Sequence, residues 1–505
     1  MGCLAITGDP LSPDLLGSIA EHAHRAPDSP ALVWRDAVIG YRELTELADA
    51  KLTELIDLGL TAGDRVGVLA PKSPEAIALI MAATRARLRF LLPATDLGPG
   101  TLTTLLERAG CTHVLSPGSA PRLLEPGARG TLADDVSFML TTSGSTGVPK
   151  IVPLTTGGVD AFTRWAGPRF GIAPGTRVLN YAPLNFDLCL LDIWATLRHG
   201  GCAVLVPADL GLDGHRLLDL LVEQRIDVVQ AVPMMYRLVA DAARETGRTV
   251  DTARHVIFTG DTVPAALLGE LPALFPHASL HNLYGCTETN DSLLHTVDGA
   301  VPPTTPSPPA SPLPPTSPPP PTTPLPLGEP LPGVHILLVD VDGAVIQGPG
   351  VGELQVSTPF QTPGYLGTPG HDRFVRRGDV TFFRSGDLVR RHADGSLTLE
   401  GRDDFQVKVR GVRINAQEVE RVIADHGQVV EAAVVAVPDP VAGHLLRAVV
   451  RRAPGSALNS LVLRAHCAGR LPRAAVPAAL QIVDAPLPKT STGKINRRLL
   501  PPMEG

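Results

Sequence analysis

The chain has little of what membrane proteins, nucleic-acid-binding proteins and disulfide-bonded scaffolds need. No apolar run in its 505 residues approaches the length of a membrane span. The net charge of -7 and the pI near 6.1 give no basic surface for a nucleic acid, and no stretch alternates cations with aromatic rings. The six cysteines are scattered without CxxC spacing, which argues against a zinc site and a disulfide framework. We therefore expect a cytoplasmic protein with no membrane and no nucleic-acid partner.

What is present is a globular composition with an uneven distribution of lysine. Hydrophobic residues make up 44% of the chain and charged residues 19%, enough apolar material for a substantial core. The length predicts about three domains, or one large multi-lobed body and a small domain. Arginine far outnumbers lysine, and most of the few lysines fall in candidate motifs. They are Lys51, Lys72, Lys150, Lys408, Lys489 and Lys494.

The first half of the chain alternates helical periodicity with short apolar runs. Helical spacing covers residues 12–60 and returns near residues 76–85. Because strands that alternate with helices form parallel sheets, this pattern predicts an α/β fold. The runs that we interpret as strands are residues 64–69, Val114, and residues 178–181, 203–206, 228–232 and 255–258.

The second half contains a proline-rich tract and a small terminal domain. About half of residues 301–327 are proline, so this tract cannot form a helix or a central strand. It is open to three interpretations: an interdomain linker, a docking site or, as we favour, an inert insertion in one large body. We expect that body, with parallel sheets and a β-rich lobe, to span residues 1–403. A mobile α+β domain is expected at residues 404–505.

The stretch Ser143–Lys150 reads S-G-S-T-G-V-P-K and suits a phosphate chain. Its glycines bring backbone N–H groups close to an anion, its hydroxyls donate hydrogen bonds, and Lys150 adds positive charge. The spacing is not that of a Walker loop, because Pro149 precedes the lysine and Ile151 follows it. Taken alone, the string could still be a surface turn.

Four further strings follow in order: Tyr284–Glu288 (Y-G-C-T-E), Ser385–Leu388 (S-G-D-L), residues 401–411 (G-R-D-D-F-Q-V-K-V-R-G) and Thr492–Lys494 (T-G-K). With the phosphate loop, they resemble the adenylate-forming superfamily of acyl-CoA synthetases, luciferases and the adenylation domains of peptide synthetases. The resemblance spans nearly the whole chain and implies that ATP and Mg²⁺ activate a carboxylate as an acyl-adenylate.

That resemblance also implies a role for each motif residue. Lys494 is expected to be the catalytic cation, bridging the substrate carboxylate and the α-phosphate, and Glu288 to hold the Mg²⁺ ion. Asp404 corresponds to the hinge on which the small domain turns between half-reactions. The expected phosphate contacts are Thr142, Ser143, Gly144, Ser145, Thr146, Gly147, Lys150 and Thr287. The expected nucleoside contacts are Gly260, Asp261, Tyr284, Asp387 and Arg402.

Asn185-Phe186-Asp187-Leu188 resembles the segment whose aspartate pairs with a substrate α-ammonium in amino-acid adenylation domains. The other interpretation of Asp187 is a helix cap. By the same resemblance the substrate pocket comprises Asp187, Leu188, Leu191, Gln230, Ile257, Thr259, Leu283, Asp291 and Ser292. Since a second acid could receive a second amine, a polar or diamino acid, or a β-amino acid, is a hypothesis for the substrate. Asp291 could equally point away from the pocket.

The sequence departs from the pattern of this family at several positions. Cys286 stands where proline is usual, Thr156 where histidine is common, and the Leu471–Pro477 string lacks its tyrosine. No carrier-like segment is seen after Gly505, so we expect a freestanding enzyme of natural-product (antibiotic) biosynthesis that loads a separate acyl or peptidyl carrier protein. The carrier would approach through residues 408–413. The alternatives are an acyl- or aryl-CoA ligase and a catalytically silent scaffold.

Overall fold

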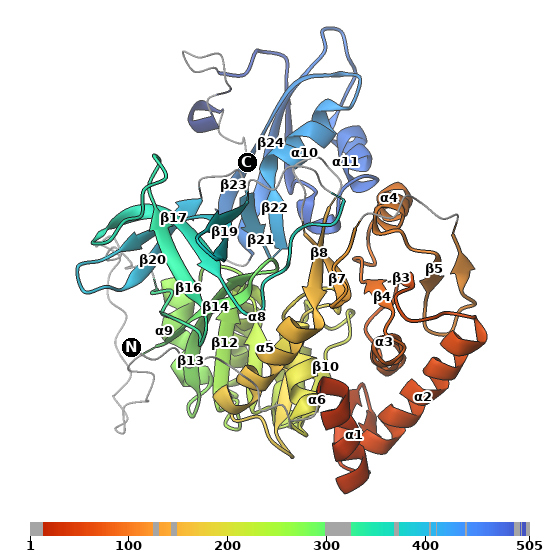
Figure 1. Ribbon diagram of the computed structural model, residues 1–505. Helices are drawn as coiled ribbons and strands as arrows, with labels where there is room; N and C mark the ends of the chain where they lie inside the picture. The colour runs from red at the N-terminus through yellow and green to blue at the C-terminus, as the bar shows by residue number, and fades with distance from the viewer. Residues whose placement is uncertain are drawn as a thin grey trace.

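The computed structural model has three sheet-containing lobes and a terminal domain (Figure 1). It describes residues 14–124, 131–142, 149–297, 325–367, 373–402, 406–410, 412–439, 442–488, 495 and 497–500. Within those residues no helix is long and apolar enough to cross a membrane.

The first sheet has six strands in the order β6-β5-β3-β4-β7-β8. Strands β7 and β8 pair with each other, and the phosphate-loop sequence lies between them in the chain. Helix α3 packs in its core: Ser73 caps the helix by accepting from Ala76 N at 3.2 Å, and its residues 76–83 are all buried. The strands are β3 (Arg65–Val68), β4 (Arg89–Leu91), β5 (His113–Leu115), β6 (Arg122–Leu123), β7 (Val136–Thr142) and β8 (Lys150–Thr155). The helices are α1 (Leu15–Arg25), α2 (Tyr41–Asp57), α3 (Pro74–Arg85) and α4 (Pro99–Ala109).

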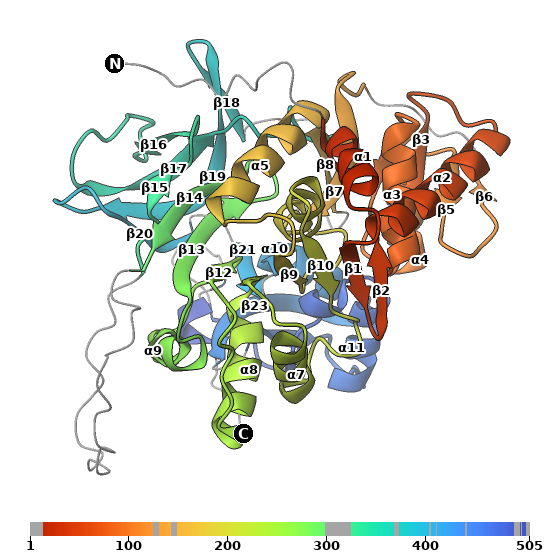
Figure 2. The same cartoon turned by 90° about the horizontal axis from the view of Figure 1, so that it is seen from below.

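The second sheet has nine strands in the order β15-β14-β13-β12-β11-β9-β10-β1-β2, and its central strands are parallel. One face packs against α7, α8 and α9, and the other against α5 and the π-helix η1 (Figure 2). The strands are β1 (Pro30–Trp34), β2 (Ala37–Gly40), β9 (Arg177–Asn180), β10 (Cys202–Leu205), β11 (Val228–Ala231), β12 (His255–Thr259), β13 (Ser279–Cys286), β14 (Asn290–Thr296) and β15 (Glu329–Pro330). The helices are α5 (Thr156–Arg169), η1 (Leu190–Ala195), α6 (Thr196–Arg198), α7 (Gly214–Glu223), α8 (Pro233–Thr246) and α9 (Ala265–Leu274).

The third sheet is antiparallel and brings Asp387 toward the second sheet. Its central strand β19 pairs with β17, β18 and β20. The strands are β16 (His335–Val339), β17 (Gly350–Ser357), β18 (Phe374–Arg377), β19 (Val380–Arg391) and β20 (Leu397–Arg402).

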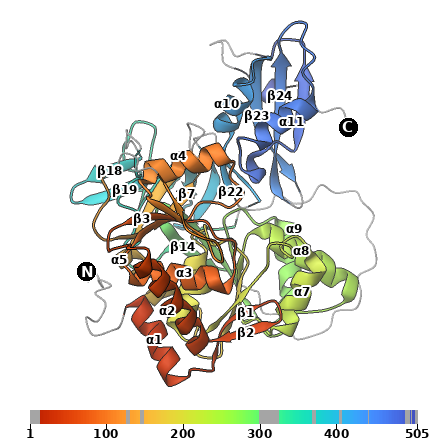
Figure 3. The ribbon, with the colours of Figure 1, turned by 90° about the vertical axis from the view of Figure 1, so that its right-hand side faces the viewer.

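The last elements form a lobe of their own with a separate hydrophobic core (Figure 3). A hairpin of β21 and β22 leads into a three-stranded sheet of β23, β24 and β25. The elements are β21 (Gln406–Val409), β22 (Val412–Asn415), α10 (Ala416–Ala424), β23 (Val429–Asp439), β24 (Gly443–Arg452), α11 (Ser460–Ala468), η2 (Arg473–Ala475), β25 (Ala479–Val483) and η3 (Arg497–Leu499).

The predicted α/β class is confirmed, with two local corrections. Residues 30–40 form the hairpin of β1 and β2 and interrupt the predicted helical span of residues 12–60. The proline-rich stretch ends inside the fold, because the Asn282 amide donates to Pro326 O at 2.7 Å and Leu327 is 4% exposed. An inert insertion is therefore a possibility only for residues 301–324, which lie outside the described residues together with 298–300.

Candidate active site

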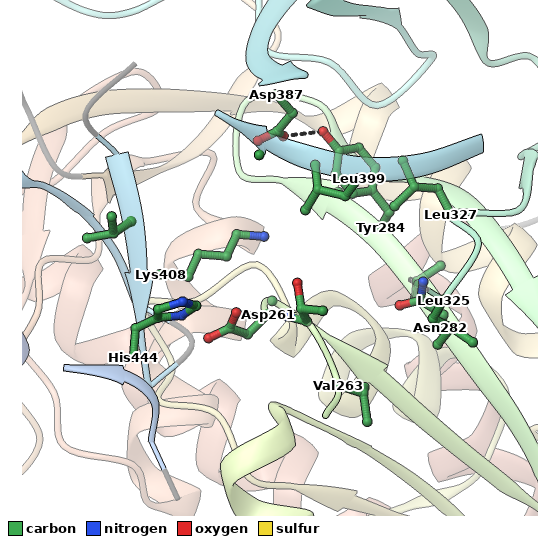
Figure 4. A pocket seen from close by; sticks show the side chains of 16 residues that line it. Asp261, Val263, Asn282, Tyr284, Leu325, Leu327, Asp387, Leu399, Lys408 and His444 are labelled. Carbon is green, nitrogen blue, oxygen red and sulfur yellow. Dashed lines mark hydrogen bonds between the residues drawn. The ribbon is translucent and has the colours of Figure 1, made fainter. Parts of the chain in front are cut away.

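A cavity of about 380 Å³ lies where the second sheet, the third sheet and the C-terminal lobe meet (Figure 4). Its volume is in the range of small-molecule sites, and most of its lining is apolar. The expected nucleoside contacts Gly260, Asp261, Tyr284 and Asp387 all line it. The other lining residues are Thr262, Val263, Asn282, Leu283, Gly285, Leu325, Leu327, Leu399, Gly401, Val407, Lys408 and His444.

Tyr284 and Asp387 form the upper wall of this cavity as drawn in Figure 4. The Tyr284 hydroxyl donates a hydrogen bond to Oδ2 of Asp387. The position of Asp387 is fixed by Ser385, whose hydroxyl accepts from Asp387 N at 3.0 Å and donates to Leu354 O at 2.7 Å. The aromatic ring and the carboxylate thus stand together, which suits a purine and its ribose. Arg402 pairs with Asp387 in the register of β20 and β19.

The C-terminal lobe closes the opposite side of the cavity. Lys408 of β21 and His444 of β24 lie near Asp261. Burial raises the pKa of Asp261 above its usual value, although the hydrogen bond from the Thr262 backbone and the charges of Lys408 and His444 act against this rise. The backbone of the C-terminal lobe approaches the Asp261 side chain closely, since a Cβ at Gly443 would lie 2.9 Å from Asp261 Oδ2. The cavity is therefore lined both by the larger sheets and by the C-terminal lobe.

Glu288, the predicted metal ligand, is buried and held in place by an aromatic residue. Tyr365 donates to Glu288 Oε1 at 2.6 Å, and the Thr362 amide donates to Glu288 O at 2.9 Å. The Lys150 ammonium stands 4.5 Å from the centre of the Tyr365 ring, a cation–π contact. The lysine of the phosphate loop and the candidate metal ligand are thereby connected through Tyr365.

The expected substrate residues gather on one face of the second sheet. Gln230 lies in register with Asn180 on one side and Ile257 on the other, and this face packs against η1. The Gln230 amide is 3.5 Å from Leu188 O. A π-helix at this place is typical of functional sites. The predicted members that the face brings together are Leu188, Leu191, Gln230, Ile257, Thr259 and Leu283.

Asp187 lies in the turn before η1, where Leu190 N donates to its carbonyl oxygen at 2.8 Å. Burial and the nearby charge of Glu288 raise the pKa of its carboxyl to about 6, against hydrogen bonds from the Thr287 hydroxyl and the backbone. Thr287, predicted to contact the α-phosphate, therefore joins the nucleotide side of the site to the substrate side. At pH above about 6 Asp187 is an anion ready to pair with an ammonium group.

Several predicted residues lie outside the described part of the chain: Ser143, Gly144, Ser145, Thr146, Gly147, Asp404 and Lys494. Thr142 is described at the end of β7, opposite Lys150 on β8. Ile495, which follows Lys494, packs against the cluster of Ala433, Val449 and Leu487 in the C-terminal lobe. The role of each of these residues stays a prediction.

Tyr365, Asn282, Lys408 and His444 were not among the predicted site residues. Asn282 stands two positions before Tyr284 on the same strand, so the period of two along a strand could have singled it out. Lys408 was predicted only as part of a docking loop. Nothing in the local sequence around Tyr365 or His444 marks either residue, since each reaches the site through a long-range contact.

The fold and the site together define an adenylate-forming ligase, and the chain belongs to the AMP-binding enzyme family. The model of that family matches residues 19–131 and 118–366, and the AMP-binding enzyme C-terminal domain model matches residues 418–494.

Similar proteins of known name share most of this length. An L-proline--[L-prolyl-carrier protein] ligase of Pseudomonas fluorescens is 31% identical over 94% of this chain and 96% of that protein. The ligase of the same name from Streptomyces coelicolor is 30% identical over 95% of this chain and 94% of that protein. The Vibrio cholerae adenylation domain AlmE, solved with glycyl-adenosine-5'-phosphate, has a TM-score of 0.80 at 19% identity and covers 97% of this chain and 98% of its own. This last likeness concerns the fold.

Proposed function

We propose that this protein activates an amino acid with ATP and transfers it to the phosphopantetheine thiol of a separate carrier protein. The observation that carries the proposal is Asp187, a partly buried carboxylate that accepts a hydrogen bond from Thr287 at the edge of the nucleotide side of the site. A fatty or aryl acid gives such a carboxylate no partner, whereas an amino acid brings an ammonium group. The two carrier-protein ligases named above support the same chemistry.

In the first half-reaction a carboxylate oxygen of the amino acid attacks the α-phosphorus of ATP. The bond from that phosphorus to the β-phosphate oxygen breaks, so pyrophosphate leaves and an aminoacyl-adenylate remains. The barrier is one of charge and alignment. Tyr284 and Asp387 would orient the nucleoside, and Lys150 would neutralise the leaving pyrophosphate. In the second half-reaction the carrier thiol would attack the aminoacyl carbon and displace AMP. Lys408 and His444 lie on the side of the cavity where it meets the C-terminal lobe.

Glu288 fits a magnesium ion. Mg²⁺ is commonly held by one or two carboxylates plus substrate phosphates and water, and here one buried carboxylate stands beside the phosphate-loop lysine and its Tyr365 contact. The ion would supply charge neutralisation on the phosphates. No group of three potential metal ligands occurs among the described residues, which agrees with a site completed by the nucleotide.

ATP–pyrophosphate exchange with a panel of amino acids tests the proposal. We expect exchange that needs an amino group and falls at least about 100-fold in Asp187→Ala, because a buried charge pair is worth several kcal/mol when one partner is removed. Exchange driven by acids without an amino group, and unaffected by Asp187→Ala, would instead establish an acyl- or aryl-CoA ligase. Thioester formation with a pantetheinylated carrier, compared with coenzyme A, identifies the acceptor.

Lys494→Ala tests the cation assigned by resemblance. We expect adenylation to fall by several orders of magnitude while ATP binding is largely kept, because the lysine would act mainly on charge that develops in the transition state. Near-normal exchange in this variant contradicts the assignment.

A further inference from the structure

The proposed function leaves one buried carboxylate of the substrate face without a task. Asp291 on β14 is 8% exposed, and no hydrogen bond reaches its carboxylate from the described residues. Burial and the negative charge of Asp187 raise its pKa to about 8. An acid in this position is costly unless it meets a cation.

The backbone around Asp291 is fixed by its neighbours and not by its own side chain. Asn290 adopts a left-handed conformation with φ 54° and accepts from Asp291 N at 2.8 Å through its side-chain oxygen. Gly285 faces Asp291 in register, and a Cβ there would lie 2.6 Å from the Asp291 Cα. The Ser292 hydroxyl donates to Asn290 O at 3.1 Å. The Asp291 carboxylate is thus positioned but left uncommitted.

A second uncommitted acceptor belongs to the same substrate face. Gln230 is fully buried, its Nε2 is directed to Leu188 O, and its Oε1 has no hydrogen-bond partner among the described residues. The substrate side of the site therefore offers two acceptors without a donor among the described residues, the Asp291 carboxylate and the Gln230 side-chain oxygen, near the carboxylate of Asp187.

The positive charge of Lys72 lowers the pKa of the neighbouring acid Asp192 against the effect of burial. Its Nζ donates to Asn180 O at 2.9 Å and Tyr181 O at 3.1 Å, and burial lowers its pKa to about 8. It favours the ionised form of Asp192, which also accepts from the Asn180 amide at 3.2 Å. No described lysine or arginine acts in this way on Asp187 or Asp291. Burial raises the pKa of both, hydrogen bonds from Thr287 and the backbone lower that of Asp187, and the charges that act on the two residues are those of other acids.

We propose that the amino acid activated by this protein carries a second ammonium group, which Asp291 and the Gln230 side-chain oxygen bind while Asp187 binds the first. This rests on the proposed function, whose substrate class it names. A monoamine such as proline, alanine or β-alanine would engage one carboxylate and leave the other unpaired. A diamine satisfies both, and because the charge of Asp187 acts on Asp291, the two carboxylates lie close together and we expect a short side chain between the two amines.

Steady-state exchange with matched substrates tests this inference. The panel pairs 2,3-diaminopropionate with alanine, 2,4-diaminobutyrate with 2-aminobutyrate and ornithine with norvaline, and adds lysine, proline and β-alanine. We expect at least one diamino acid to exceed its monoamino partner about tenfold or more in kcat/KM. In Asp291→Asn the same ratio should fall below about threefold, with the KM for ATP unchanged. Glu329→Gln, which removes an exposed acid on the adjacent strand β15, is the matched control and should keep the wild-type ratio.

The outcomes separate the two proposals. Exchange with monoamino acids and none with any diamino acid overturns the inference and leaves the proposed function standing. A preference for diamines that survives in Asp291→Asn has the same two consequences. A preference confined to β-alanine also overturns it. Absence of exchange with every amino acid overturns the proposed function itself.

Discussion

Asp291→Asn should stabilise the protein, and by an amount that grows with pH. The folded protein holds the Asp291 proton up to a pKa of about 8, whereas the unfolded chain releases it near the usual 3.8. Between these values the folded state binds more protons than the unfolded state, so the stability that protonated Asp291 contributes is complete at low pH and is lost as pH rises toward 8. Each pH unit in this window costs about 1.4 kcal/mol.

The asparagine variant removes this dependence. From pH 5 to pH 8 the expected gain of the variant over the wild type increases by roughly 4 kcal/mol, three units at about 1.4 kcal/mol each. The assay is urea unfolding of both proteins, without substrates, at several pH values across that range. The measured quantity is the difference in the free energy of unfolding.

Asp209→Asn is the control for this prediction. Asp209 is paired with Arg35 on the surface, and the hydrogen bond from that guanidinium lowers the pKa of Asp209. Its contribution to stability is therefore lost only as pH falls through the acidic range, and its replacement should change stability equally at pH 5 and pH 8. Parallel pH profiles for the wild type and Asp291→Asn would refute the reasoning, because they would mean that Asp291 is ionised in the folded protein throughout.

Three further changes probe other parts of the site. Tyr365→Phe removes the hydroxyl that holds Glu288, so we expect the Mg²⁺ concentration for half-maximal exchange to rise about three- to tenfold; an unchanged Mg²⁺ requirement contradicts this. The KM for the amino acid should rise as pH falls below about 6, where Asp187 becomes protonated, and a KM that is flat from pH 5 to 8 would show that Asp187 does not pair with the substrate. Deletion of residues 301–324 should leave exchange within about twofold of the wild type. A deletion that continues through Leu327 should raise the KM for ATP, because Leu325 and Leu327 line the cavity that we assign to the nucleoside. Equal effects of the two deletions would contradict that assignment.

The sequence predicted the class of fold, and it predicted residues that the structure brings together around one cavity, for a physical reason. Binding a nucleotide needs groups of fixed type at fixed offsets along a chain segment, so Tyr284 and Asp387 could each be predicted from a short string. In the structure the two side chains are joined by a hydrogen bond. Helical periodicity misled us over residues 30–40, because a strand of residues 30–34 that is buried on both sides has the same apolar density as a helix.

Other features depend on contacts that no local pattern carries. His444 and Tyr365 reach the site from β24 and from the segment after β17, and the sequence around them is ordinary. The proline-rich composition likewise concealed where the fold resumes, since Pro326 and Leu327 belong to the fold although the sequence just upstream is similar in composition. Such residues become functional only through tertiary packing.

The difference between the two halves of the site has an energetic consequence. At the cavity lined by Tyr284 and Asp387, the Asp387 carboxylate already accepts a hydrogen bond from the Tyr284 hydroxyl. On the substrate side burial raises the pKa of both Asp187 and Asp291, and a neighbouring acid raises each pKa further, Glu288 for Asp187 and Asp187 for Asp291. The protein thus carries an electrostatic cost that a ligand with complementary charge would relieve. Specificity then follows from what is left unpaired: a substrate with too few positive charges gains less from binding, although it fits the same space.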